Sequence, residues 1–186
     1  MRTHLAALRM LLVFTVITGI AYPLAVTGIA QAAFSDQANG SIVKQDGRTV
    51  GSSLIGQKFA GTRWFEPRPS AGGYDPLASG ATNLGPNSPE LVKTVQQRRS
   101  AVAKLNGVAE SQVPADAVTA SGSGLDPDIS TAYASIQVNR VAEARGLSTT
   151  AVRKLVAANT HGRALGFLGE EYVNVVELNL ALVKLG

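Results

Sequence analysis

Cysteine is absent from this 186-residue chain, which excludes disulfides, zinc fingers and thiol catalysis. Histidine is scarce, because only His4 and His161 occur. A histidine-rich metal site is therefore excluded, and a Ser-His-Asp triad would need His161 as its base, although no G-x-S-x-G nucleophile motif is present. Charge is also sparse: 16% of the residues are charged, 17 basic and 13 acidic, and no cluster of Lys or Arg indicates a nucleic-acid partner.

What the chain does have is one long uncharged run, from Met10 to Ala33, in which 17 of 24 residues are apolar. As a helix this run would be about 36 Å long, enough to cross a hydrocarbon core of about 30 Å. Arg2 and Arg9 precede the run, and all the acidic residues follow it. The positive-inside rule then places residues 1–9 in the cytoplasm and residues 34–186 outside, as one domain of ordinary size.

A cleaved signal peptide is the alternative interpretation of this segment. Ala30-Gln31-Ala32, followed by Ala33, has the small residues of a cleavage site, but the apolar run exceeds the about 7–15 residues usual in such peptides. We therefore expect an uncleaved membrane helix, with a kink at Pro23 near its middle. Thr15, Gly19 and Pro23 follow one another at four-residue spacing on one face, so a partner helix could approach closely at Gly19.

The part of the chain after this helix predicts a domain of the α+β class. Residues 40–90 contain nine Gly and five Pro, a composition that favours short strands joined by turns. We expect a hairpin formed by residues 41–43 and 49–55 around the Asp46-Gly47 turn, a further strand at residues 63–66, and an ordered loop over residues 71–89.

Helical signals dominate the second half of the chain. Ser88-Pro89 is a typical start of a helix, and Asn106-Gly107 is a typical end. A second helix is expected from about Ile129 to Arg145, and a third begins after Ser148. Residues 172–185 fit both the strand and the helix period, and we expect a short strand followed by a helix.

Several polar stretches resemble ligand sites. Ser121-Gly122-Ser123-Gly124 is similar to a phosphate loop but lacks the G-x-G-x-x-G and Walker patterns, so a tight turn is the simpler interpretation. Asp126, Asp128 and Ser130 alternate like the first ligands of a calcium loop. The glycine and the bidentate glutamate of such a loop are missing, which favours helix capping by Asp126 or Asp128. His161 follows the third predicted helix, where a cation suits the negative end of the helix dipole.

Two more constellations have both a structural and a functional interpretation. Gln137 and Arg140 share one face of the second predicted helix and could meet a polar ligand, but buried hydrogen bonds between helix and loop need no ligand, and we favour them. Trp64, the only tryptophan, lies beside Phe65 between two arginines. This pair fits either an aromatic core contact or an anchor in an interface, where Trp and Arg are enriched.

Longer blocks of sequence carry more information than composition. They read GSSLIGQ-x-F (51–59), WF-x-PRPS (64–70), SGATNLGP (79–86), VTASGSGLDP-x-IS (118–130), Q-x-x-RVA-x-ARG (137–146), FLGE (167–170) and VNVV-x-LNLAL (173–182). In this order they closely resemble the C subunit of the Kdp potassium-transporting ATPase, over essentially the whole chain. Departures such as Trp64 for the usual Tyr and Asp128 for a frequent His fall at the edges of the blocks.

The resemblance implies an uncleaved, single-span subunit of the cell membrane. Its implied partners are an ATP-hydrolysing P-type subunit, a potassium-binding channel-like subunit and a small membrane peptide. The implied role is that of a catalytic chaperone that raises the ATP affinity of the pump subunit, without being an enzyme, and the chain indeed lacks the Asp-Lys-Thr-Gly motif of P-type pumps and any P-loop. The alternative function is that of an exported binding domain, released by signal cleavage, without a pump partner.

No catalytic residue and no metal ligand is expected in this chain. A domain outside the cell cannot touch cytoplasmic ATP, so we expect its effect on ATP to be transmitted through the partner subunits. For a direct contact with ATP, the candidates are Gly122, Gly124, Gln137 and Arg140. The candidates for contact with partner subunits are Gly19, Trp64, Arg68 and Asn83.

Overall fold

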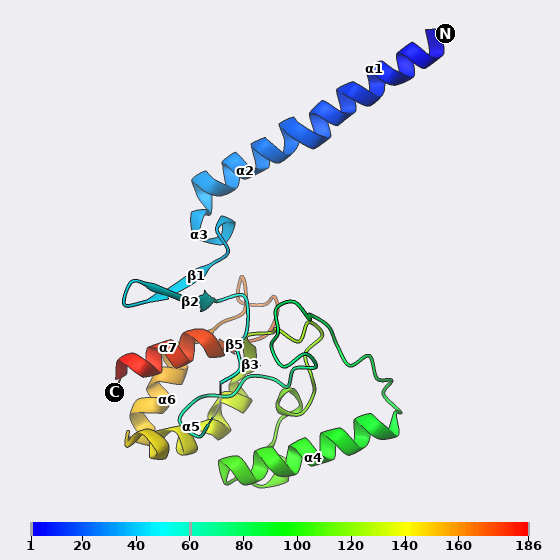
Figure 1. Cartoon of the computed structure of the whole chain (residues 1–186). Helices are drawn as coiled ribbons and strands as arrows, with labels where there is room; N and C mark the ends of the chain where they lie inside the picture. Colours follow the sequence, from blue (N-terminus) through cyan, green and yellow to red (C-terminus); the bar gives the residue numbers. More distant parts are fainter. Residues whose placement is uncertain (1, 60, 186) are drawn as a thin grey trace.

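A computed structural model describes residues 2–59 and 61–185 of the chain. Helix α1 (Arg2–Val16), the π-helical turn η1 (Ile17–Ala21) and helix α2 (Tyr22–Ala33) follow one another without a break and form a rod that projects from a folded domain (Figure 1). The rod is 32 residues long, is apolar enough to cross a membrane, and is not buried against the domain. The predicted apolar helix is confirmed, and it begins at Arg2 instead of Met10.

The π-helical turn ends at Ala21, two residues before Pro23. A proline has no backbone N–H, and its ring collides with the carbonyl four residues earlier, here that of Gly19. At the end of the turn the Tyr22 N–H donates to the Ile17 carbonyl, five residues back, which is the wider spacing of a π-helix. The distortion expected at Pro23 therefore takes the form of one widened turn.

The rod is joined to the domain by a short helix and a hairpin. Helix α3 (Ser35–Ala38) is followed by the antiparallel strands β1 (Ile42–Gln45) and β2 (Arg48–Ser52). Asp46 and Gly47, between the strands, have φ values of +50° and +77°. Two positive φ values are the geometry of a type I′ turn, which matches the twist of the flanking strands, so the predicted hairpin is confirmed.

The rest of the described domain contains a small antiparallel sheet, with strand order β3-β5-β4, and the helices α4 to α7, of which α4 packs against α5. Two 3₁₀ turns connect the first two of these helices. The elements are α4 (Pro89–Asn106), η2 (Glu110–Gln112), η3 (Ala115–Ala117), β3 (Asp128–Ser130), α5 (Thr131–Arg145), α6 (Thr149–Ala158), β4 (Thr160–His161), β5 (Tyr172–Asn174) and α7 (Val175–Leu185).

Helix boundaries follow the local signals of the sequence. Ser88 accepts a hydrogen bond from the Leu91 N–H at the start of α4, and Gly107, with φ of +64°, ends that helix. Ser148 caps α6 in the same way, by accepting from the Ala151 N–H at 3.2 Å. The expected division of residues 172–185 into a strand and a helix is confirmed by β5 and α7.

One predicted element is wrong, and a second, the helix expected from about Ile129 to Arg145, is present but begins at Thr131. Residues 63–66 form no strand; they belong to a long loop that runs over residues 61–88. Ile129 does not begin a helix but lies in β3, and α5 starts only after Ser130, which accepts from the Tyr133 N–H at 3.0 Å. The helix cap is therefore Ser130, and neither Asp126 nor Asp128.

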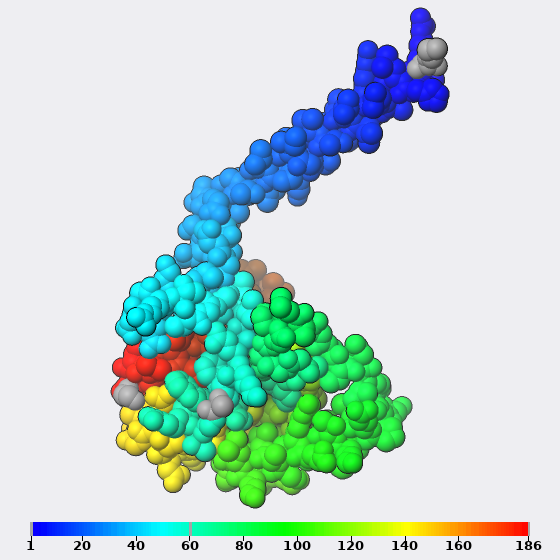
Figure 2. Space-filling view, in the orientation of Figure 1, coloured from blue at the N-terminus to red at the C-terminus, as the bar shows by residue number. Residues whose placement is uncertain are grey.

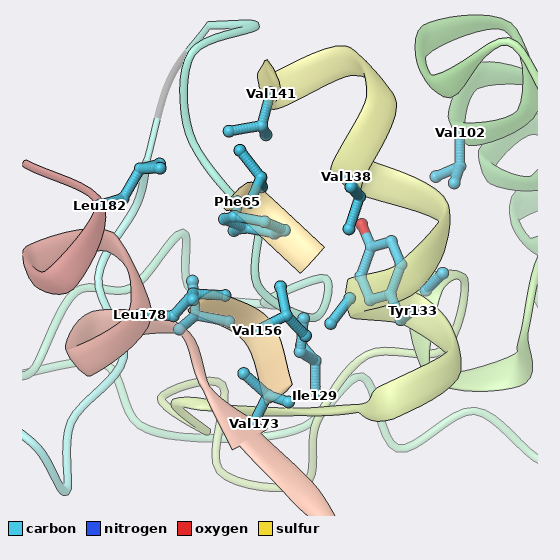
Figure 3. Packing of buried hydrophobic residues seen from close by; sticks show 14 of the residues in the cluster. Phe65, Val102, Ile129, Tyr133, Val138, Val141, Val156, Val173, Leu178 and Leu182 are labelled. Atoms are coloured by element: carbon cyan, nitrogen blue, oxygen red, sulfur yellow. The ribbon is translucent and has the colours of Figure 1, made fainter. Parts of the chain in front are cut away.

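One hydrophobic core lies between the helices α5, α6 and α7 and the sheet. Figure 3 shows Phe65, from the long loop, among side chains of α5 and α7. Tyr133 and Val138 of α5 and Val173 of β5 are almost completely buried in the same cluster. Because Phe65 comes from a segment without regular structure, its buried backbone needs hydrogen-bond partners other than those of a helix or a sheet.

Candidate functional site

The segment at residues 62–66, called the clamped segment below, is held by polar side chains instead of a neighbouring strand. Asn179 of α7 accepts a hydrogen bond from the Phe65 N–H at 2.9 Å and donates through Nδ2 to the Phe65 carbonyl at 2.9 Å. Asn179 is 1% exposed, and Phe65 is fully buried. A buried backbone must have its polar groups paired, and here one amide side chain pairs both groups of Phe65.

Gln137 of α5 holds the next residue with the same pattern. Its Oε1 accepts from the Glu66 N–H at 2.7 Å, and its Nε2 donates to the Glu66 carbonyl at 3.1 Å. Gln137 is completely buried. Two amide side chains from two helices therefore imitate the ladder that a strand partner would have supplied.

Arg140, one helical turn after Gln137, completes the clamp. Its guanidinium donates to the carbonyls of Thr62 and Trp64, at 2.7 and 2.9 Å. It also donates to Gln137 Oε1 at 2.7 Å and to Asn106 Oδ1 of α4 at 2.8 Å. Burial lowers the pKa of Arg140, an effect that the nearby Glu66 carboxylate partly offsets. These are the buried hydrogen bonds between helix and loop that the sequence favoured for Gln137 and Arg140.

The glycine-rich loop packs elsewhere, against residues 69–80. The Ser121 N–H donates to the Pro69 carbonyl at 3.1 Å, and the Gly124 N–H donates to Ser121 Oγ at 2.8 Å. A Cβ atom on Gly124 would lie 2.9 Å from the Gly80 carbonyl oxygen, and its φ is +70°, so glycine is needed for this close approach. A Cβ on Gly122 would meet nothing within 4 Å. The contacts described for this loop do not bring it together with Gln137 and Arg140.

Arg68 forms an ion pair on the same side of the domain. Its Nη1 lies 3.0 Å from Asp126 Oδ2, and its carbonyl accepts from the Tyr74 hydroxyl at 2.7 Å. Asp126 Oδ1 in turn accepts from the Asp128 N–H at 3.0 Å. About a quarter of the Arg68 side chain remains exposed, which leaves it accessible to a partner.

A hollow of about 380 Å³ opens beside this ion pair. Phe59 and Tyr74 supply aromatic walls, and Arg68 and Arg98 supply positive charge. Burial raises the pKa of Glu66 at the edge of the hollow, an effect that the charge of Arg140 partly opposes. A pocket that is largely apolar with a few charged groups could accept a small organic anion.

Trp64 lies at the surface side of the clamped segment. Its ring is 5.9 Å from the ring of Phe59, centroid to centroid, and the Arg145 guanidinium lies 4.5 Å from its ring centroid. Arg145 also donates to the Arg63 carbonyl at 2.8 Å. Of the aromatic pair, Phe65 is therefore the core residue, whereas Trp64 stays partly exposed and could also contact a partner.

The remaining candidates for partner contact are exposed. Gly19 lies on the rod, and a Cβ there would meet nothing within 4 Å, so a neighbouring helix could approach it. Asn83 is exposed in the long loop and has a φ of +52°, a conformation that Asn tolerates better than most residues. Whether these residues contact partners stays a prediction.

His161 lies in strand β4, just after the end of α6. Its ring stacks on that of Tyr172, with centroids 4.8 Å apart, and its Nε2 is 3.1 Å from Glu177 Oε2. Asp128 is close by, and burial raises the pKa of its carboxyl although Asn174 donates a hydrogen bond to it. Among the described residues, no three His, Asp or Glu side chains are grouped so as to hold a metal ion.

The sequence analysis did not predict the buried hydrogen bonds of three asparagines, one of which, Asn106, it used only as a helix end. Asn179 and Asn106 belong to the clamp, and Asn174 accepts from the N–H groups of Val176 and Glu177 at the start of α7. Asn174 and Asn179 stand inside the apolar run of residues 173–182, and a polar residue in such a run must find partners when it is buried. The two asparagines in this apolar run were therefore the signal in the sequence that could have predicted buried hydrogen bonds.

Comparisons with known proteins show the family of this chain. The family model described as "K+-transporting ATPase, c chain" matches residues 4–184. Proteins named "Potassium-transporting ATPase KdpC subunit" are similar over nearly their whole length. The one from Kineococcus radiotolerans is 56% identical over 184 residues, which cover 98% of this chain and 93% of that protein. The one from Mycobacterium tuberculosis (strain ATCC 25618 / H37Rv) is 54% identical over 187 residues, or 99% of each chain. This chain therefore belongs to the KdpC family of potassium-transporting ATPase subunits, because the family model and these relatives match it over nearly its whole length.

Proposed function

We propose that this chain is the non-catalytic subunit of an ATP-driven potassium uptake pump and acts as a catalytic chaperone. It raises the affinity for ATP of the P-type subunit that hydrolyses it. Its other partners are a potassium-binding, channel-like subunit and a small membrane peptide. Membership of the KdpC family supports the assignment of this chain to a potassium pump, and it is the observation on which the proposal rests.

The topology is part of the proposal. Residues 1–9 lie in the cytoplasm, residues 10–33 cross the cell membrane once, and residues 34–186 form the domain outside. The basic flank of Arg2 and Arg9 supports this orientation, because positive charge before a span favours the cytoplasmic side. The uncharged run of residues 10–33 supports an uncleaved anchor, since it is longer than the apolar part of about 7–15 residues that is usual in a signal peptide.

ATP is then bound by the partner subunit and not by this domain. The partners of Gln137 and Arg140 lie within the chain, and any ligand there would have to replace hydrogen bonds that hold the clamped segment. A direct site at Gly122, Gly124, Gln137 and Arg140 would also need the domain on the cytoplasmic side. We infer instead that the domain binds two conformations of the pump unequally, and that this difference favours the one with high affinity for ATP.

Removal of the domain tests this proposal. The pump is purified once with the full chain and once with a chain that ends after Ala33, and ATPase activity is measured against ATP and potassium concentration. We expect the apparent KM for ATP to rise by about 5- to 150-fold, the usual range of coupling between distant sites, while phosphoryl transfer itself persists.

If the complex with the shortened chain assembles and shows unchanged affinities and turnover, the chaperone role is contradicted. The subunit would then act only as a scaffold for assembly. The intact mass of the chain in the membrane fraction provides a second readout. A chain shortened by residues 1–32 would favour the exported, cleaved form.

Trp64→Ala tests the contact with partners without removing the domain. Because the ring is partly exposed, its loss should cost only about 1–2 kcal/mol, from the contacts with Phe59 and Arg145. Recovery of the partner subunits in a pull-down should fall, while the melting temperature of the full chain in detergent changes little. A melting shift as large as that of Phe65→Ala would instead make Trp64 a core residue.

A further inference from the structure

The loop between β4 and β5 exposes large apolar side chains to solvent. In this segment, called the apolar loop (residues 163–169), the exposed fractions are 82% for Leu165, 70% for Phe167 and 50% for Leu168. The remainder of the domain keeps most of its large apolar residues in one core. Three adjoining apolar side chains at a loop tip are costly in water and mark a surface that binds something.

Four backbone N–H groups of the apolar loop donate to carbonyls within the loop. The Ala164 and Leu168 N–H groups each donate to the other residue's carbonyl, both at 2.9 Å. The Gly166 N–H donates to the Arg163 carbonyl at 3.0 Å, and the Phe167 N–H donates to the Ala164 carbonyl at 3.3 Å. Internal pairing of this kind is what a chain segment needs in order to enter an apolar medium, where no water replaces a missing partner.

The position of the apolar loop narrows down what it binds. Figure 1 shows it (brown) projecting from the side of the domain where the rod leaves, and Figure 2 shows its atoms near the base of the rod. A hydrogen bond also links the connection from the rod to the strand after the apolar loop: the carbonyl of Ser53, which directly follows β2, accepts from Asn174 Nδ2 of β5 at 2.8 Å. Strand β5 begins three residues after the apolar loop ends.

Two further exposed apolar side chains belong to the segments that join the rod to the domain. Leu54, which follows β2 and is 63% exposed, borders the same surface hollow as His161 and Tyr172 at the base of the apolar loop. Phe34, at the end of the rod, is 59% exposed. Arg163 stands at the start of the apolar loop and can extend its charged end to lipid headgroups while its stem stays among apolar groups.

We propose that the apolar loop is a second membrane contact of this subunit, in which Leu165 and Phe167 enter the interfacial layer of the bilayer that the rod crosses. The occupant is lipid, because a span that ends at Ala33 brings the headgroup layer to this side of the domain. Insertion to a depth of about 5–10 Å is typical of such contacts. Two attachments, rod and apolar loop, then fix the tilt of the domain over the membrane. The proposal rests on the membrane anchor proposed above.

Single cysteines test this proposal cleanly, because the chain has no cysteine of its own. Phe167→Cys is labelled with an environment-sensitive NBD fluorophore in the full chain and reconstituted in phosphatidylcholine vesicles, with and without brominated acyl chains. We expect the emission of the label to be shifted to the blue in the vesicles, and to be quenched when the acyl chains are brominated. Val92→Cys is the matched control: it replaces a 49% exposed apolar residue on α4, at the other end of the domain in Figure 1, and its label should stay in water.

Leu12→Cys, in the rod, separates failure of this proposal from failure of the anchor. If the label on Leu12→Cys is quenched while the label on Phe167→Cys behaves like that on Val92→Cys, the lipid contact is overturned and the anchor stays intact. Shielding of the Phe167→Cys label only after the partner subunits are added also overturns the lipid contact, in favour of docking to protein. An unquenched label on Leu12→Cys overturns the anchor, whatever the result for Phe167→Cys.

Discussion

Phe65→Ala is expected to lower the free energy of unfolding by about 3–5 kcal/mol, the usual cost of removing a buried phenylalanine. The ring is fully buried, and it lies among side chains of α5 and α7 (Figure 3). Its backbone is fixed by Asn179, so the loop cannot easily move in to fill the space. The loss is a large share of the stability of about 5–15 kcal/mol that is usual for a domain.

Chemical unfolding of the full chain in detergent, followed by circular dichroism, measures this effect. Trp64→Ala is the matched control, because it removes a larger aromatic ring from the neighbouring residue, where the side chain is partly exposed. Equal losses for the two variants would show that the exposed side of the clamped segment contributes as much as the core side, contrary to the packing described above.

Arg140→Ala is expected to cost roughly 3 kcal/mol or more. The guanidinium serves two backbone carbonyls and two side-chain oxygens, and its removal leaves these buried acceptors without their donor. A hydrogen bond to a charged group contributes about 1.5–3 kcal/mol, and an unsatisfied buried group costs about 1–3 kcal/mol, although such values do not add simply. Loss of the clamp should also loosen residues 62–66, which hydrogen exchange at Phe65 would detect.

Arg153→Ala provides the control for the lost charge. Arg153 is exposed on α6, where a substitution usually changes stability by less than about 0.5 kcal/mol. Arg140→Lys adds a second test, because a lysine keeps the charge but cannot reach four acceptors in a planar arrangement. Full stability of Arg140→Lys would mean that charge, and not the pattern of hydrogen bonds, is what the clamp requires.

The elements that the sequence predicted correctly are those with local signals. Asp46-Gly47 defines the hairpin, Ser88 and Gly107 define α4, and Ser148 starts α6. In each case the residues that determine the conformation are within a few positions of the element. Local chemistry was sufficient there, and no knowledge of the tertiary structure was needed.

The wrong predictions concern segments whose partners are distant in the chain. The residues around Phe65 look like a strand, but their hydrogen bonds go to Gln137, Arg140 and Asn179, and Asn179 follows Phe65 by 114 positions. Ile129 fits a helical stripe, yet the pairing of β3 with Val173 of β5 keeps it extended. For the candidate site, the shared face of Gln137 and Arg140 was predictable, whereas the loop that they hold was not.

The widened turn at Ile17–Ala21 also changes the direction in which the side chains after it point around the axis of the rod. A single π turn adds one residue to the helix, and one residue corresponds to a rotation of about 100°. In a regular α-helix Thr15 and Pro23, which are eight residues apart, would differ in direction by about 80°, because eight steps of about 100° exceed two full turns. The extra residue of the widened turn removes most of this difference, so that Thr15 and Pro23 point within roughly 20° of each other. The small residues before and after the turn therefore face nearly the same direction, and a straight neighbouring helix can follow them along both halves of the rod.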